Sequence, residues 1–265
     1  MMKRLRIWHV GNWCFHTGQT YIESPFFHST KGVEFLNYAK NFVEALKKIP
    51  GAEVISEPSW NLYNMSPEQF DERLRWATTI VFGDVETKCL HLHPDFFNRN
   101  KWDNYVTFPD RFVLLKDWVN NGGHFHMLGG WNSFSGEMGK GGWGRSLFHN
   151  VLPVVCLQGD DLIESTASFP VRAPHPGHPV IEGITFDEIP PILGFNETSL
   201  RPGADCILEI GYDGKWYPLL AAQRFGKGKA SAFTTSASPH WGINLQRWEK
   251  YDKLWLQLFT RLFEE

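Results

Sequence analysis

Short apolar runs alternate with helix-like stretches through the first half of the chain. Four runs that are mostly apolar predict buried β-strands, at residues 5–11, 52–58, 78–85 and 124–128. Strands that are buried on both faces are typical of parallel sheets, in which helices cover the two sides. The pattern therefore predicts a doubly wound α/β fold around a parallel sheet with right-handed crossovers.

Three segments between these runs predict helices. Residues 32–49 place apolar side chains at helical spacing and stop at a Pro-Gly pair. In residues 66–77, Ser66 is the expected N-cap and Gln69 completes a capping box. Residues 110–123 begin at an aspartate and end in "NNGG", a sequence that is typical of helix ends.

The second half of the chain has a different pattern. Short apolar runs are joined by tight turns, of which Asp213-Gly214 and Gly226–Gly228 predict β-hairpins. These hairpins predict an antiparallel C-terminal extension of the parallel sheet. Residues 245–263 carry one continuous apolar stripe and predict a final helix that packs on the core. No linker or internal repeat divides the chain, so we expect residues 1–265 to form a single domain.

Composition excludes several classes of partner. The net charge is −3 and no basic run occurs, which argues against a nucleic-acid or anionic-membrane surface. No segment reaches the roughly 18 apolar residues of a membrane span, and the N-terminus lacks a signal-peptide core. The four cysteines are far apart and fit reduced thiols. These features predict a soluble, cytoplasmic protein.

The loops at one end of the sheet gather the candidate site residues. In open parallel sheets ligands bind outside the carboxyl ends of the strands. That rule brings together a group of aromatic and polar side chains from four loops: Trp13, His16, Asp84, Trp131, Ser133, Glu137, His240 and Trp241. Aromatic faces with a few polar groups suit a small polar ligand such as a sugar or a metabolite amide. The alternative is that the rings cover the core and no ligand binds.

Glycines shape the loop that follows Leu128. Gly129-Gly130 at a strand end permits a positive φ and the close approach of a ligand or another backbone. Further on, "GEMGKGGWG" supplies backbone N–H groups for an anion-binding nest. Neither segment has the spacing of a nucleotide-binding glycine motif, so the sequence predicts no nucleotide cofactor.

Seven motifs carry a resemblance to a known family. They are "VFGDV", "NNGGHFHMLGGWNSFSGEMGKGGWG", "VLPV", "HPGHPVIEGI", "GFNETS", "PLLAAQRFGKGKASAFTTSASPHWG" and "YDKLWLQLF", and they span most of the chain in order. In these motifs the chain resembles the class I glutamine-amidotransferase-like superfamily, and within it the "putative glutamine amidotransferase" family, related to trehalose-utilisation-protein-like domains. The resemblance implies a flavodoxin-like α/β fold: a doubly wound, mostly parallel sheet with an antiparallel C-terminal extension.

The resemblance also implies where a catalytic triad would lie. Active members of the superfamily carry a cysteine in a nucleophile elbow, which falls here on residues 128–131, and this segment contains no cysteine. The His-x-Glu turn of the superfamily falls on residues 238–242, which keep His240 but have Gly242 in place of the acid. The oxyanion loop would be Gly83-Asp84. We therefore do not expect glutaminase chemistry by the usual route.

The first hypothesis for function is binding of a small polar, carbohydrate-like ligand at the carboxyl rim of the sheet. The residues assigned to it are Trp13, Gly83, Asp84, Gly129, Gly130, Trp131, Ser133, Glu137 and Trp241. A second hypothesis is a divergent amidotransferase or hydrolase in which His240 is the base for Ser133, Cys14 or Cys89. A third is an oligomerisation module, and a homo-oligomer is compatible with all three.

Histidine pairs raise the question of a metal. His91 and His93 form one His-x-His pair, and His124 and His126 form another, with Asp84 or Glu137 as available carboxylates: two ligands on one strand face plus a carboxylate can bind zinc. A histidine inside a covered strand is more often a hydrogen-bonded core residue. We therefore expect no metal and no cofactor.

Overall fold

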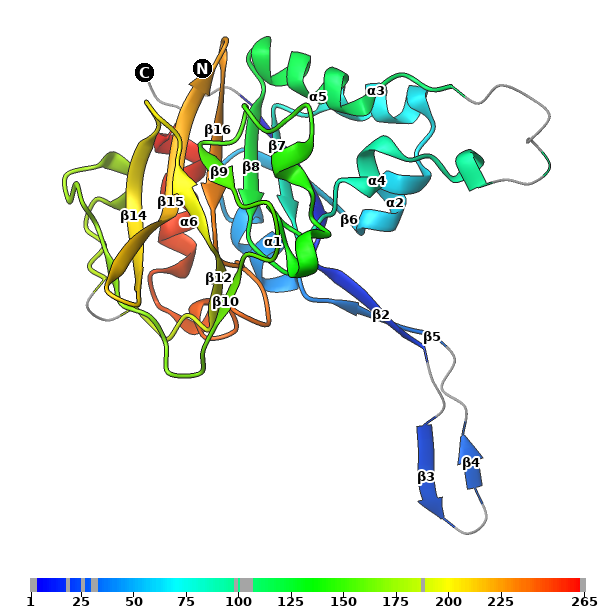
Figure 1. Cartoon of the computed structure of the whole chain (residues 1–265), viewed down its shortest axis with the longest axis horizontal. Coiled ribbons are helices and arrows are strands. Elements are labelled where there is room, and N and C mark those ends of the chain that lie inside the picture. The colour runs from blue at the N-terminus through cyan, green and yellow to red at the C-terminus, as the bar shows by residue number, and fades with distance from the viewer. Residues whose placement is uncertain are drawn as a thin grey trace.

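The computed structural model describes residues 4–17, 20–24, 27–29, 33–97, 100, 107–186 and 189–262 (Figure 1). An eight-stranded sheet runs through the body in the order β11-β14-β15-β16-β8-β7-β1-β6. Five neighbouring strands are parallel: β16 (Gly228–Phe233), β8 (His124–Leu128), β7 (Thr79–Gly83), β1 (Leu5–Gly11) and β6 (Ala52–Glu57). The expected mostly parallel, flavodoxin-like sheet is thereby confirmed.

The antiparallel extension is confirmed as well. It consists of β15 (Lys215–Phe225), β14 (Asp205–Tyr212) and β11 (Val171–Arg172), added in that order beyond β16. The Asp213-Gly214 turn joins β14 to β15, and the turn at Gly226 joins β15 to β16. Smaller two-stranded sheets lie outside the main one and pair β9 (Val154–Cys156) with β13 (Thr198–Leu200), and β10 (Leu162–Glu164) with β12 (Gly194–Asn196).

Helices cover both faces of the main sheet. The helices are α1 (Lys40–Lys47), α2 (Ser59–Asn64), α3 (Pro67–Trp76), α4 (Lys88–His91), α5 (Arg111–Asn120) and α6 (Tyr251–Arg261), and the short 3-10 turns are η1 (Pro94–Phe97), η3 (Glu137–Gly139), η4 (Trp143–Arg145), η5 (Pro179–Ile181) and η6 (Leu245–Arg247). One core contains Phe42 of α1 and Trp255 of α6, and the other contains Phe70 of α3 and Phe112 of α5. The sheet is therefore doubly wound.

The predicted helix starts are found at two places. Ser66 caps α3, and its hydroxyl accepts the N–H of Gln69 while the Gln69 side chain accepts the N–H of Ser66. The carboxylate of Asp110 caps α5 by accepting the N–H groups of Phe112 and Val113. Both helices thus begin where their capping residues satisfy N–H groups that lack a partner inside the helix.

The prediction for residues 32–49 was wrong in its first part. Residues Val33–Asn37 form strand β5, which pairs antiparallel with β2 (Trp13–Thr17), and helix α1 begins only at Lys40. The segment between β1 and β5 contains β2 and a second strand pair, β3 (Thr20–Ser24) with β4 (Phe27–Ser29). The β2–β5 ribbon leaves the body of the molecule (Figure 1). The segment forms a strand rather than a helix because it pairs with β2, where Phe35 lies opposite Phe15.

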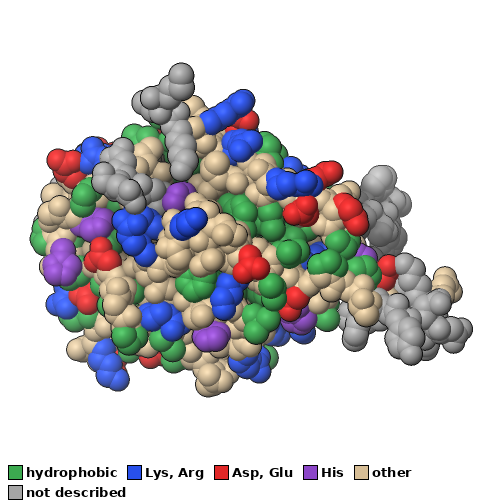
Figure 2. Space-filling view, turned by 90° about the horizontal axis from the view of Figure 1, so that it is seen from above, with side chains coloured by type: hydrophobic (Ala, Val, Ile, Leu, Met, Phe, Trp, Pro, Cys, Tyr) green, Lys and Arg blue, Asp and Glu red, His purple; other side chains and the backbone are tan. Residues whose placement is uncertain are grey.

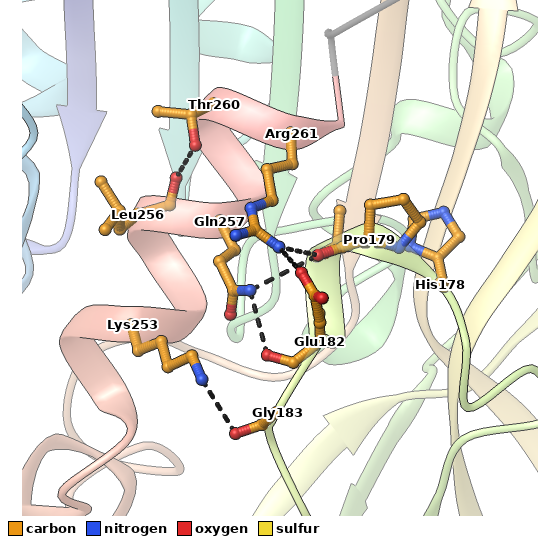
Figure 3. A network of polar contacts seen from close by, with 10 residues as sticks. His178, Pro179, Glu182, Gly183, Lys253, Leu256, Gln257, Thr260 and Arg261 are labelled. Atoms are coloured by element: carbon orange, nitrogen blue, oxygen red, sulfur yellow. Dashed lines mark hydrogen bonds and ion pairs between the residues drawn. The ribbon is translucent and has the colours of Figure 1, made fainter.

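The "HPGHPVIEGI" segment docks on the last helix. Figure 3 shows Lys253 donating to the carbonyl of Gly183, and Gln257 donating to the carbonyls of Pro179 and Glu182. Arg261 forms an ion pair with the Glu182 carboxylate. These bonds join the segment to α6, whose Trp255 and Phe259 rings contact Phe233 of β16 and His126 of β8.

The distribution of surface charge and the length of the helices bear on possible contacts with nucleic acid and membranes. Acidic and basic side chains are intermingled over the face seen in Figure 2. Within the described ranges, no helix combines the length and the apolar character that crossing a bilayer requires.

Candidate functional site

A cavity of about 280 Å³ lies at the carboxyl ends of β1, β7 and β8 and beside the loop after β16. Seven of the residues named in the sequence-based hypotheses line it: Trp13, Cys14, Asp84, Gly130, Trp131, His240 and Trp241. They come from four separate segments, which the parallel strands deliver to the same edge of the sheet. This is the edge of the sheet that the order of strands and loops predicts for the site.

Two neighbouring strands end in residues with left-handed backbone conformation. Asn12 follows β1 with φ of 54°, and Asp84 follows β7 with φ of 59°. Gly11 and Gly83 are register partners, so the two residues leave the sheet side by side. The N–H of Asn12 donates to the carbonyl of Gly83 over 2.9 Å, and buried His9 lies 3.3 Å from the Asn12 side-chain oxygen. Such conformations cost free energy and concentrate at functional sites.

Asp84 presents the only carboxylate among the residues that line this cavity in the described structure. Its Oδ1 accepts the backbone N–H of Asn132 over 2.7 Å and the Asn132 side-chain amide over 3.3 Å. Burial raises the pKa of Asp84, while the hydrogen bonds from Asn132 and the proximity of His240 act in the opposite direction. The group is therefore suited to accept hydrogen bonds from a ligand or to hold a proton.

Aromatic rings form the rest of the wall. The Trp131 and His240 rings stack, with their centroids 5.2 Å apart and an interplanar angle of 25°. The centroid of the Tyr38 ring lies 5.5 Å from that of His240. One oxygen of Glu164 accepts both indole N–H groups, from Trp131 over 3.0 Å and from Trp241 over 2.6 Å. Glu164 thus fixes the relative position of two tryptophans from different loops.

The glycine turn after β8 has no room for side chains. A Cβ atom on Gly129 would lie 2.2 Å from the carbonyl oxygen of Thr234, and one on Gly130, where φ is 155°, would lie 2.7 Å from Oδ1 of Asp84. At Gly242 a Cβ atom would approach the Ser236 carbonyl to 2.1 Å. The backbone can pass so close at these three positions because they are glycines.

Buried Asn196 holds the turn in place. Its oxygen accepts the Gly130 N–H over 3.0 Å, and its amide donates to the Gly130 carbonyl over 3.1 Å and to Asp161 over 2.8 Å. Asp161 in turn accepts the N–H groups of Ser135 and Gly136. Burial raises the pKa of Asp161 to about 6, against the effect of these hydrogen bonds. Asn196 and Asp161 therefore hold the loop that carries Trp131 in place through hydrogen bonds to its backbone.

Four of the residues assigned to the ligand site, Gly83, Gly129, Ser133 and Glu137, do not line the cavity. Gly83 and Gly129 support it from behind, the first against Asn12 and the second through N–H contacts to Phe233 and Thr235. The Ser133 hydroxyl is buried, donates to the Leu128 carbonyl over 2.6 Å and accepts the Asp84 N–H over 3.0 Å. This geometry favours a structural role for Ser133 over a nucleophilic one.

Glu137 is also not among the residues that line the cavity. It is exposed on the η3 turn, where it pairs with Lys140 at 3.2 Å. The side chain of His16 lies outside the described part of the structure. The glycine-rich loop is also not an open nest: the N–H groups of Gly139, Lys140 and Gly141 donate to carbonyls of Gly136, Glu137 and Ser135. The nest interpretation is therefore not supported for these three donors.

Thiols and histidines fall into distinct environments. Cys14 lines the cavity together with His240, whereas burial raises the pKa of Cys89 to about 12. Among the residues that the structure describes, no cluster of three or more potential metal ligands occurs. His126 is fully buried, contacts the Ser231 hydroxyl at 2.6 Å, and has its pKa lowered to about 3 by burial.

Sequence reasoning missed several residues of the site. Asn12, Tyr38, Asn132, Ser236 and Pro239 also line the cavity. Asn12 and Asn132 stand directly beside predicted positions, so the rim rule could have included them. Glu164 and Asn196 belong to short strands of the second half; Asn196 lies in the quoted motif "GFNETS", but the spacing of neither residue indicates its contacts with the site.

The comparisons with known proteins agree with this architecture. A family model described as "Putative glutamine amidotransferase" matches residues 8–264. The chain belongs to this family. Comparison with curated proteins gave no significant match.

Solved structures of other proteins share the fold. The cytoplasmic protein STM3548 from Salmonella typhimurium is 28% identical, with a TM-score of 0.82 over 97% of this chain and 98% of that one. The cytoplasmic protein STM1381 from Salmonella typhimurium LT2 is 23% identical, with a TM-score of 0.81 over 98% and 100%. A β-galactosidase from Rahnella sp. R3 is 15% identical, with a TM-score of 0.50 over 85% of this chain and 27% of that chain. The last two likenesses show the fold alone.

Proposed function

We propose that this member of the amidotransferase-like family binds a small polar, carbohydrate-like ligand in the cavity at the carboxyl rim. The observation that carries the proposal is the pair of tryptophans, Trp131 and Trp241. They line the cavity together with Asp84, and the Glu164 carboxylate accepts both of their indole N–H groups. An aromatic face contacts the C–H side of a sugar ring, while a carboxylate and an amide accept and donate hydrogen bonds to its hydroxyls.

The size of the cavity supports a small ligand. Ligand pockets in proteins span about 300–1,000 Å³, and this one measures about 280 Å³. Its lining combines the rings of Trp13, Tyr38 and Trp241 with the polar groups of Asp84 and Asn132. No lysine or arginine is among the described residues that line it, which favours a neutral ligand over an anion.

The steric closure of the triad positions supports binding over thiol chemistry at the elbow. Neither Gly129 nor Gly130 has space for a cysteine side chain, and Gly242 has no space for an acid. A glutaminase of the usual design needs a thiolate, a base and an orienting group in contact. The turn therefore serves as a binding turn, with the Asp84 carboxylate in the space that a side chain at position 130 would need.

A thermal-shift screen tests the proposal. The wild-type protein is compared with Trp131→Leu against a panel of monosaccharides, sugar acids and small amides. We expect at least one compound to raise the melting temperature of the wild type in a concentration-dependent way and to have less effect on the variant. A panel in which no compound stabilises the wild type would contradict the proposal.

The shared cavity of Cys14 and His240 favours a second candidate, a divergent hydrolase in which His240 activates the Cys14 thiol. Its test is ammonia release from glutamine by the wild type, Cys14→Ser and His240→Ala. Activity that both substitutions abolish would support the enzyme. If the wild-type protein releases no ammonia from glutamine, glutaminase activity is excluded for this candidate.

Location and assembly belong to the same proposal. We place the protein in the cytoplasm, in line with the two Salmonella proteins whose names say so. A homo-oligomer is compatible with the binding function, and light scattering after size-exclusion chromatography measures the mass in solution.

A further inference from the structure

A second cavity is lined in part by the glycine-rich loop. Its volume is about 430 Å³, and it is lined by the segment at Thr87 and Lys88, by His91 of α4, and by the loop from Gly139 to Leu147. The same two segments bound the aromatic cavity further up the chain, at Asp84 and at residues 130–132. The two cavities have no lining residue in common and are therefore separate sites.

The side chains around this second cavity have one sign of charge. Lys88, Lys140 and Arg145 line it together with the imidazole of His91, and no acidic residue is among its described lining. Of the described acidic groups, Glu137 reaches Lys140 at 3.2 Å, where both side chains are half exposed. Lys88 and His91 have no ion-pair partner within the described residues. The cavity therefore carries an excess of positive charge.

The structure also says which groups would meet an anion. The loop N–H donors of Gly139, Lys140 and Gly141 are already used within the loop. Recognition would therefore rest on the flexible cationic side chains rather than on a backbone nest. Arg145 donates to the Gly139 carbonyl over 3.3 Å and so ties its guanidinium to the rim. Thr87 and Ser146 also line the cavity, but the Ser146 hydroxyl already donates to the Trp143 carbonyl over 2.8 Å.

We infer that this cavity is a binding site for a phosphate group, carried by inorganic phosphate or by a small phosphomonoester. Three cationic side chains around a concave surface match a dianion better than a neutral ligand. The volume leaves space for an organic part beside the phosphate, next to the apolar side chains of Phe112 and Leu147. This site does not depend on the proposed function of the aromatic cavity.

Titration calorimetry with the full chain tests the inference, with inorganic phosphate and glycerol 3-phosphate as probes at low and high NaCl. We compare the wild type, the double variant Lys88→Gln/Lys140→Gln and the control Lys227→Gln, an exposed lysine on the β15–β16 turn. Both lysines of the double variant are exposed, so we expect it to fold. Affinity is expected to fall about tenfold or more in the double variant and to stay unchanged in the control.

The outcomes separate the alternatives. Tighter binding of glycerol 3-phosphate indicates a phosphomonoester ligand, and equal binding of both probes indicates free phosphate. Absence of binding to the wild type, or equal weakening in the double variant and the control, would overturn the site. Phosphate binding that survives in Trp131→Leu shows that this site stands even if the aromatic cavity proves to bind nothing.

Discussion

The carboxylate of Asp84 occupies the space into which a side chain at position 130 would project. A Cβ atom built on Gly130 comes within 2.7 Å of Asp84 Oδ1, and the φ of 155° is one that other residues rarely adopt. Asp84 itself is held there by its left-handed backbone and by two hydrogen bonds from Asn132. The site is thus built around a carboxylate instead of a side chain from the turn.

Substituting Gly130 tests this relationship. We expect Gly130→Ala to lower the free energy of unfolding by about 1–3 kcal/mol, because the new methyl group meets a buried carboxylate and the backbone is strained. Gly177→Ala is the matched control, since a Cβ at Gly177 meets nothing within 4 Å. Urea denaturation gives both values. Equal stability of the two variants would show that Asp84 does not fill this space.

The shared acceptor of the two indoles gives a second prediction. Glu164→Ala removes the oxygen that Trp131 and Trp241 both contact, whereas Glu164→Gln keeps an acceptor oxygen. In ¹⁵N–¹H spectra of the twelve tryptophans, we expect Glu164→Ala to move two indole signals. Glu164→Gln should move the same two by less. Movement of many indole signals, or of none, would contradict the shared contact.

Acid sensitivity follows from buried His126. Burial lowers its pKa to about 3 in the folded protein, while the unfolded chain keeps a value of about 6.5. Below pH 6.5 the unfolded chain therefore binds the extra proton, and stability falls as the pH decreases toward 3. Between pH 7 and pH 4.5 this one group accounts for about 2–3 kcal/mol.

His126→Gln isolates that contribution, because glutamine does not titrate. We expect the loss of unfolding free energy between pH 7 and pH 4.5 to be smaller in His126→Gln than in the wild type. His149→Gln, at an exposed histidine, is the control and should follow the wild type. The same pH dependence in all three proteins would mean that His126 is already protonated in the fold.

Much of the fold could be predicted because local signals and tertiary structure agree. The capping residues Ser66 and Asp110 and the turn at Asp213-Gly214 act within a few residues of themselves. The helix expected over residues 32–49 failed at its start because pairing between Phe35 and Phe15 depends on a partner strand. Spacing along the sequence carries no information about that partner.

Only those site residues that lie in the loops after the parallel strands could be predicted from the sequence. Asp84 and Trp131 follow parallel strands directly, so the rim rule places them together. Glu137 lies six residues beyond Trp131, and the turn at Gly136 carries it to the exposed side of the loop. Glu164 and Asn196 act on the site across long stretches of sequence, through contacts that exist only once the chain has folded.

The most direct test of the central claim follows the indole signals of Trp131 and Trp241 during titration with the monosaccharide panel. Their assignment comes from the Glu164→Ala spectrum. The account predicts that one sugar or related polar compound shifts these two signals in a saturable way, and that Asp84→Asn weakens the response. If every compound leaves both signals unmoved at concentrations up to the solubility limit, the cavity is not a ligand site and the account is contradicted.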